Sequence, residues 1–228
     1  MKYNLLAIDA STEALSIAIY YNGKTFRYFE ECPQQHSQKI LPKIDAMLLD
    51  AECSLKDLDG IAFGKGPGSF TGVRIGVAIA QGLAYSSGLK LVGVSSLQTM
   101  AQQAIDEHNQ CRVISGIDAR MGEIYIGDYS KDENGLAVSN NQEIVCNPDN
   151  LENIVSSSCA VGTAWVTYPN TALSHNLSVL ENVTLPNAFY MLKIADHAFS
   201  TGNTVDAADA QPNYVRDTVT WKKLPGKE

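Results

Sequence analysis

Short apolar runs and longer segments of helical spacing alternate along the first 105 residues. The short runs are bounded by glycine, asparagine or proline, as strands are, whereas the longer segments repeat apolar residues every three or four positions, as amphipathic helices do. The predicted strands are residues 4–9, 15–21, 24–31, 60–63 and 89–94. The predicted helices are residues 34–51, residues 71–86 and a third that begins at Ser96. This order, βββαβαβα, predicts an α/β protein with a mixed sheet covered by helices.

The second half of the chain repeats the opening of the first. Ile-Asp-Ala ends two predicted strands, at residues 8–10 and 117–119. A polar turn, an apolar strand and an Asn-Gly pair follow in both halves, the pairs at residues 22–23 and 134–135. Asn-Gly favours a tight hairpin because both central turn residues take positive φ. A duplicated fold explains the repeat, and a chance similarity of a few residues is the alternative.

Two lobes follow from the duplication. We predict an N-terminal lobe over residues 1–105 and a C-terminal lobe over residues 106–228. The second lobe should contain a helix near residues 187–200 and an irregular tail from Gln211.

Composition narrows the possible functions. The 228 residues are 45% hydrophobic and 18% charged, with a net charge of −8. That balance argues against a large nucleic-acid-binding surface, because such surfaces neutralise phosphates with cations, although a small basic patch remains compatible with it. The five cysteines contain no CxxC pair and indicate reduced thiols. No apolar stretch approaches a membrane span or a signal-peptide core, so we expect a cytoplasmic protein without a membrane partner.

A glycine-rich turn at residues 64–72 joins a predicted strand to a helix, which is where phosphate loops are found. Its spacing fits neither GxxxxGK[ST] nor GxGxxG. The plainer interpretation is a tight turn in which Ser69 or Thr71 caps the helix.

Asp9 and Asp118 occupy equivalent places in the two halves, where a facing pair of carboxylates could hold Mg²⁺ on a nucleotide. The turns beside them argue against this. The first lacks glycine and carries Glu13, which would repel phosphate, and the second lacks a hydroxyl. We therefore favour degenerate turns over a working phosphate site.

Neither a metal site nor a serine nucleophile is indicated. Among the four histidines, none lies three or four positions from another, so no helical metal pair exists. No GxSxG elbow occurs. We predict no catalytic residue, no cofactor and no metal.

The helix at residues 71–86 carries apolar residues on more than one side. One stripe is Val73, Val77, Ala80 and Ala84, and the other is Ile75, Ile79 and Leu83. Small residues at positions 72, 76 and 80 would also let another helix approach closely. Because covering one sheet requires only a single stripe, the helix is either wholly internal or half of a partner interface.

Several motifs together resemble the bacterial TsaB (YeaZ) family. They are Ile-Asp-Ala-Ser-Thr-Glu-Ala at residues 8–14, His36 before Ile40-Leu41-Pro42, the glycine-rich turn extended to Gly76, Ile-Asp-Ala-Arg-Met-Gly-Glu at residues 117–123, and the ending Trp-Lys-Lys-Leu-Pro-Gly-Lys-Glu at residues 221–228.

The resemblance implies a two-lobed actin-like (ASKHA) fold and a role in making threonylcarbamoyladenosine beside the anticodon of tRNAs that read A-starting codons. In that system the paralogue TsaD transfers the threonylcarbamoyl group to N6 of adenosine. TsaB is its non-catalytic partner, paired through helices, and the ATPase TsaE docks on the pair. TsaD carries an HxxxH metal pair where this chain has Ser-Leu-Gln-Thr-Met at residues 96–100, without histidine.

We accordingly expect a TsaD interface on the helices at residues 34–51 and 71–86, and no tRNA contact except through the complex. The spacing does not decide which stripe faces outward. The predicted interface residues are Leu41, Ile44, Leu48, Val73, Gly76, Val77, Ala80 and Ala84. A homodimer of the lone chain through the same helices is an alternative. A second alternative is an active ASKHA-type ATPase or kinase, or a metallopeptidase-like enzyme.

Overall fold

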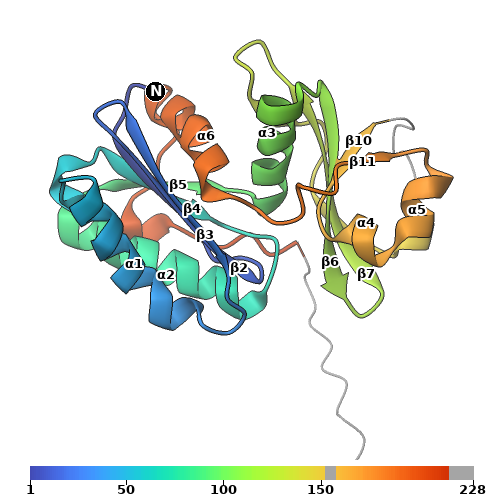
Figure 1. Ribbon diagram of the computed structural model, residues 1–228, viewed down its shortest axis with the longest axis horizontal. Coiled ribbons are helices and arrows are strands. Elements are labelled where there is room, and N and C mark those ends of the chain that lie inside the picture. The colour runs from blue at the N-terminus through green and yellow to red at the C-terminus, as the bar shows by residue number, and fades with distance from the viewer. Residues whose placement is uncertain (152–157, 216–228) are drawn as a thin grey trace, which may run out of the picture.

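Two twisted sheets, each flanked by helices, stand side by side in the computed structural model, which describes residues 1–151 and 158–215 (Figure 1). The first sheet has the strand order β3-β2-β1-β4-β5. Its elements, with the helices that follow them, are β1 (Leu5–Asp9), β2 (Ala14–Tyr21), β3 (Lys24–Glu31), α1 (His36–Asp50), β4 (Gly60–Gly64), α2 (Phe70–Ser87), β5 (Lys90–Val94) and α3 (Ser96–His108).

The second sheet has the order β8-β7-β6-β10-β11, with β9 paired to β7. The elements of this half are β6 (Arg112–Arg120), β7 (Glu123–Lys131), β8 (Ala137–Ser139), β9 (Ile144–Cys146), β10 (Cys159–Val161), α4 (Ala164–Thr167), α5 (Pro169–Ser174), β11 (Ser178–Val179) and α6 (Ala188–Ser200). Single 3₁₀ turns lie at Leu55–Asp57, Pro148–Asn150 and Ala207–Asp209.

The two sheets share one topology, which confirms the predicted duplicated α/β fold. In the first, β1 pairs antiparallel with β2 and parallel with β4, and β4 pairs parallel with β5. In the second, β6 pairs antiparallel with β7 and parallel with β10, and β10 pairs parallel with β11. The first Asn-Gly hairpin is also confirmed, because Asn22 and Gly23 have φ values of 47° and 82°.

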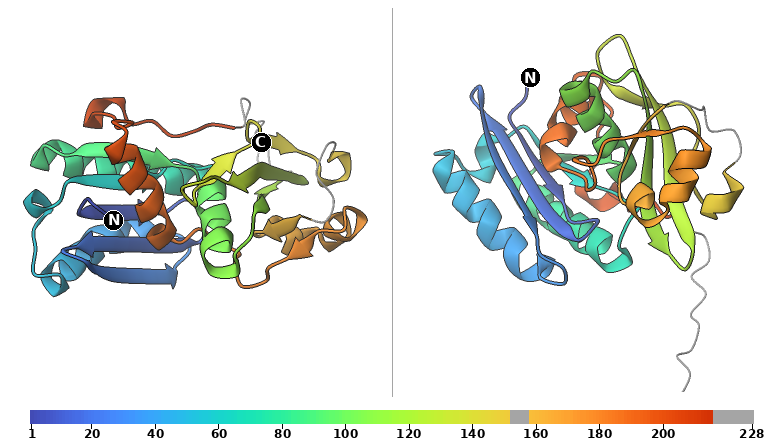
Figure 2. Two further views of the ribbon diagram at one scale, coloured as in Figure 1. Left: turned by 90° about the horizontal axis from the view of Figure 1, so that it is seen from above. Right: turned by 45° about the vertical axis from the view of Figure 1, so that its right-hand side comes forward.

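Each sheet is covered by helices from both halves of the sequence. Helices α1 and α2 cover one face of the first sheet, and α6 covers the other, although α6 follows the second sheet in sequence. Helix α3 packs against β6, β7 and β8 of the second sheet and against α6. Both helices therefore lie between the sheets (Figures 1 and 2). The predicted boundary between residues 105 and 106 stays a prediction, since no finding tests it.

The C-terminal segment returns to the first lobe. Val205 forms an isolated antiparallel β-bridge with Leu91 of β5, and Ala210 is buried in the hydrophobic core of the first lobe. Residues 211–215 have no regular secondary structure, as predicted, and the rest of the predicted tail lies outside the described residues. No helix in the described part of the chain has the length and apolar character that crossing a bilayer requires.

Candidate partner interface and the two hairpin turns

Helix α2 begins and ends at well-defined caps. The Ser69 hydroxyl accepts a hydrogen bond from the Gly72 amide at 3.3 Å, which confirms the predicted serine cap. The Ser69 amide donates to the Ser11 carbonyl at 2.7 Å, so the cap also ties the helix to the turn after β1. Gly88 ends the helix in the left-handed conformation.

The structure decides which stripe of α2 faces inward, and it corrects most of the predicted interface. Four of the predicted residues are buried in the core of the first lobe and are not available to a partner: Val73, Val77, Ala80 and Ala84. Gly76 is buried against Ala10, and a side-chain carbon built on Gly72 would lie 2.2 Å from the Ala10 carbonyl oxygen. The small residues thus admit the chain's own first strand and turn, rather than a second chain.

Helix α1 gives a similar result. Ile44 and Leu48 are buried in the same core, so their assignment to an interface is also corrected. Leu41 is exposed, and it alone among the predicted interface residues presents a large apolar side chain to solvent.

Besides the predicted Leu41, the outward side of the helix pair carries apolar and small residues that the sequence analysis did not single out. We call this surface the α1–α2 face, and it consists of Leu41, Leu49, Ala78, Gly82 and Tyr85. Leu49 is 78% exposed and Tyr85 is 85% exposed. The signal in the sequence is the spacing of residues 78, 82 and 85, which follow one another at four and three positions on a single helix face.

The glycine-rich turn serves close packing. A side-chain carbon built on Gly68 would lie 2.1 Å from the Ser11 carbonyl oxygen. One built on Gly64 would lie 2.1 Å from Oδ2 of Asp9. Both glycines let the turn lie directly against the end of β1, which supports the tight-turn interpretation.

Asp9 is buried at the end of β1 and bonded to its own turn. Its Oδ1 accepts hydrogen bonds from the Ser11 amide at 3.0 Å and the Ser11 hydroxyl at 2.8 Å, and Ser96 donates to the Ser11 hydroxyl at 2.7 Å. Oδ2 has no hydrogen-bond partner among the described residues. Burial raises the pKa of Asp9 from 3.8 to about 6, against the opposing effects of the Ser11 hydrogen bonds and the charge of nearby His36.

Asp118 is at the matching position in the second sheet, but its surroundings differ. Its Oδ2 lies 3.2 Å from the Arg120 guanidinium, which also pairs with Glu13 at 2.9 Å. Arg120 therefore bridges the turns of the two lobes. The two aspartates occupy equivalent places, as predicted, yet one is buried on a serine turn and the other forms an ion pair.

The raised pKa of Asp9 gives a prediction for pH dependence. Between about pH 4 and pH 6 the folded protein keeps a proton that the unfolded chain has lost, so stability falls as the pH rises through that window. A shift of roughly two pKa units corresponds to about 3 kcal/mol. Other carboxyl groups titrate in the same range, so the test is the difference between two proteins. Across this window the free energy of unfolding from urea titrations should fall in the wild type relative to Asp9→Asn. Parallel pH profiles for the two proteins would show that Asp9 does not titrate in this way.

Residues 30–210 match the family model of TsaD, the tRNA N6-adenosine threonylcarbamoyltransferase. The chain is 44% identical to the tRNA threonylcarbamoyladenosine biosynthesis protein TsaB of Escherichia coli (strain K12), over 98% of this chain and 99% of that protein. It is 40% identical to the TsaB of Haemophilus influenzae, over 98% of each.

Two solved structures of similar sequence have the same fold. YeaZ from Pseudomonas aeruginosa is 35% identical, covers 94% of this chain with 100% of its own, and superposes with a TM-score of 0.85. A second Pseudomonas aeruginosa structure, titled as an uncharacterized protein with similarity to peptidase YEAZ, is 36% identical with a TM-score of 0.87, over 95% of this chain and 100% of that one.

The duplicated sheets and the paired hairpin turns define a two-lobed α/β protein with one topology repeated in both lobes. Within that class, the chain belongs to the TsaB family of tRNA threonylcarbamoyladenosine biosynthesis proteins. The predicted family and its biosynthetic role are confirmed.

Proposed function

We propose that this chain is the non-catalytic partner of the TsaD transferase, and that it binds TsaD through the α1–α2 face. In this role TsaD transfers the threonylcarbamoyl group to N6 of adenosine in tRNA, and the chain completes the active assembly. TsaE would dock on the pair. The observation that carries the proposal is that large apolar side chains, Leu41, Leu49 and Tyr85, are exposed on two adjacent helices of the first lobe.

The shape of the α1–α2 face suits a helical partner. A side-chain carbon built on Gly82 would meet nothing within 4 Å, so the helix backbone there is open to a close neighbour. Leu41 and Leu49 on α1 and Tyr85 on α2 would supply the apolar area around it. A stable pairing typically buries about 1,600 Å² in total, more than one exposed stripe provides, so both helices would be needed.

The hairpin turns support a non-catalytic role. A phosphate site in this fold needs amides and hydroxyls that approach the ligand beside a carboxylate that can hold a cation. Here Asp9 is bonded to Ser11, and Asp118 is paired with Arg120. Glu13 adds a negative charge at the same place. These arrangements favour a binding subunit over an active ATPase, kinase or metallopeptidase-like enzyme.

Turnover by the pure chain separates these functions. We expect it to hydrolyse neither ATP nor threonylcarbamoyl-adenylate, with or without added Mg²⁺ or Zn²⁺, because Asp9 is buried on its serine turn and Asp118 is paired with Arg120. The measurement is product formation by chromatography. Turnover that is lost in both Asp9→Asn and Asp118→Asn would establish an enzyme instead.

The lone chain should also bind tRNA weakly, because its net charge of −8 gives counterion release few cations to drive it. A filter-binding or anisotropy titration at physiological salt measures this. Micromolar or tighter binding would contradict the expectation that the lone chain binds tRNA only weakly.

Mixing the chain with TsaD tests the partner directly. Native mass measurement should give a heterodimer. With the lone chain it should give either a monomer or a homodimer that TsaD displaces, because both partners would use the α1–α2 face. A homodimer that persists beside free TsaD would overturn the proposal.

A further inference from the structure

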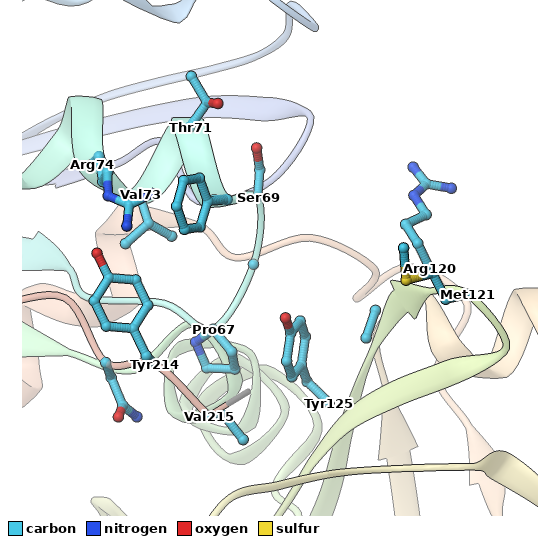
Figure 3. Close-up of a pocket in the computed structure, with 14 residues that line it drawn as sticks. Pro67, Ser69, Thr71, Val73, Arg74, Arg120, Met121, Tyr125, Tyr214 and Val215 are labelled. Carbon is cyan, nitrogen blue, oxygen red and sulfur yellow. The ribbon is translucent and has the colours of Figure 1, made fainter. Parts of the chain in front are cut away.

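A cavity of about 790 Å³ lies between the two lobes. Its walls come from three segments: residues 67–74, which enter and begin α2, the β6–β7 turn with the start of β7, and residues 213–215. Figure 3 shows the Arg74 and Tyr214 side chains on one side of the cavity and the Met121 and Tyr125 side chains on the other. The volume lies in the range of small-ligand sites, which is about 300–1,000 Å³.

Aromatic rings fix one cation in the wall. The guanidinium carbon of Arg74 lies 3.1 Å from the centre of the Phe70 ring and 5.1 Å from that of Tyr214. The two rings are themselves 6.3 Å apart. Phe70 is 53% exposed, Tyr214 50% and Met121 65%, so large apolar side chains are gathered around an opening that nothing in the described chain covers.

The segment that carries Tyr214 is held in place from both lobes. The Asn213 amide donates to the Lys65 carbonyl at 2.7 Å, and its side-chain amide donates to Glu143 at 3.2 Å. Glu143 also accepts a hydrogen bond from Tyr129. These bonds hold the backbone next to Tyr214 and so keep its ring beside Arg74.

The charges around the cavity leave Arg74 available. Arg120, the other arginine in the lining, is paired with Glu13 and Asp118. Within residues 1–151 and 158–215, the Arg74 guanidinium forms neither a hydrogen bond nor an ion pair, and it contacts the Phe70 and Tyr214 rings. A guanidinium whose faces stack on rings keeps its N–H groups at its edge, where they suit a phosphate or carboxylate.

We propose that this cavity binds one unpaired nucleotide of tRNA, with its phosphate on Arg74 and its base against the aromatic wall. The proposal rests on the chain's role in tRNA modification, which supplies RNA as the partner. Unpaired RNA is recognised by stacking on aromatic side chains and arginine planes, and a duplex offers no free base for that. Arg74 is the one available cation in the cavity lining, so the cavity offers one phosphate contact. One such contact gives only weak binding by the isolated chain, as its net charge of −8 also predicts.

The Met121 methyl group gives a local readout that does not depend on TsaD. Met121 lines the cavity, whereas Met47, Met100 and Met191 are buried elsewhere. In the full chain labelled with ¹³C-methyl methionine, an anticodon stem-loop RNA should shift the Met121 signal in a saturable way. A blunt duplex of the same stem should shift it much less at equal concentration, because it offers no unpaired base. AMP, which carries one base and one phosphate, should shift the same signal.

Three variants test the assignment. Arg74→Gln and Tyr214→Ala should each weaken the stem-loop titration by about tenfold or more, because each removes one element of the stacked phosphate site. Arg27→Gln is the matched control, since Arg27 stacks on Phe189 at 3.1 Å, away from the cavity, and the titration should not change. Native mass measurement with TsaD, run on the same variants, separates failure of this site from failure of the heterodimer.

Each other outcome would overturn the proposal. An unmoved Met121 signal would show that RNA does not enter the cavity. An equal shift by the duplex would show that the RNA contacts the cavity through its phosphates only, without an unpaired base. A shift by AMP but not by the stem-loop would identify a free-nucleotide site instead.

Discussion

Replacing Val77 by glutamate should unfold the protein, whereas the same change at its neighbour Ala78 should leave it folded. Val77 is buried in the core of the first lobe, while Ala78 is exposed on the opposite side of α2. Val77→Glu loses roughly 1.5–3 kcal/mol of apolar burial and adds an unpaired buried charge that costs several kcal/mol more. Since the free energy of unfolding of a domain is only about 5–15 kcal/mol, this loss is comparable to the total stability of the protein.

The measurement is circular dichroism with thermal unfolding of both variants. Ala78→Glu serves as the control, because an exposed substitution of this kind typically changes stability by only about 0.5 kcal/mol. A folded, cooperative Val77→Glu protein would mean that α2 packs with a different stripe inward.

Ala78→Glu should nevertheless abolish the complex with TsaD. The α1–α2 face is proposed to be dry at its centre, next to the open backbone at Gly82. A carboxylate without a partner at such a centre weakens binding by about 100-fold or more. Mass measurement of mixtures with TsaD should show free proteins for this variant at concentrations where the wild type forms a heterodimer.

A charge-matched control excludes a general electrostatic effect. Asn170→Glu adds the same charge on the exposed surface of α5 in the second lobe, and it should bind TsaD as the wild type does. Normal binding by Ala78→Glu would place the interface elsewhere on the protein.

Local sequence signals were sufficient for most of the fold. The Asn22-Gly23 turn, the Ser69 cap and the recurring Ile-Asp-Ala strand ends each report local physics, and the structure confirms the elements they predict. The exchange of α3 and α6 between sheets was not predictable in this way. It depends on packing between segments far apart in the sequence, which periodicity does not encode.

Most of the predicted interface residues are buried for a related reason. Two apolar stripes on α2 look alike in sequence, but Ala10 lies beside Gly72 and Gly76, and the stripe of Val73 and Val77 is buried while that of Ile75 and Ile79 is only partly buried. The cavity beside Arg74 was equally hidden. It is formed by Tyr214, Phe70 and the β6–β7 turn, which meet only in the folded chain.

The amount of threonylcarbamoyladenosine formed by TsaD on tRNA, in the presence of TsaE and threonylcarbamoyl-adenylate, tests the central claim most directly. TsaD alone should form none, and adding the wild-type chain should restore product. Asp9→Asn and Asp118→Asn should also restore it, because neither carboxylate is proposed to act in catalysis, whereas Ala78→Glu should not. Full product with Ala78→Glu, or a loss of product confined to the two aspartate variants, would contradict a non-catalytic subunit that acts through the α1–α2 face.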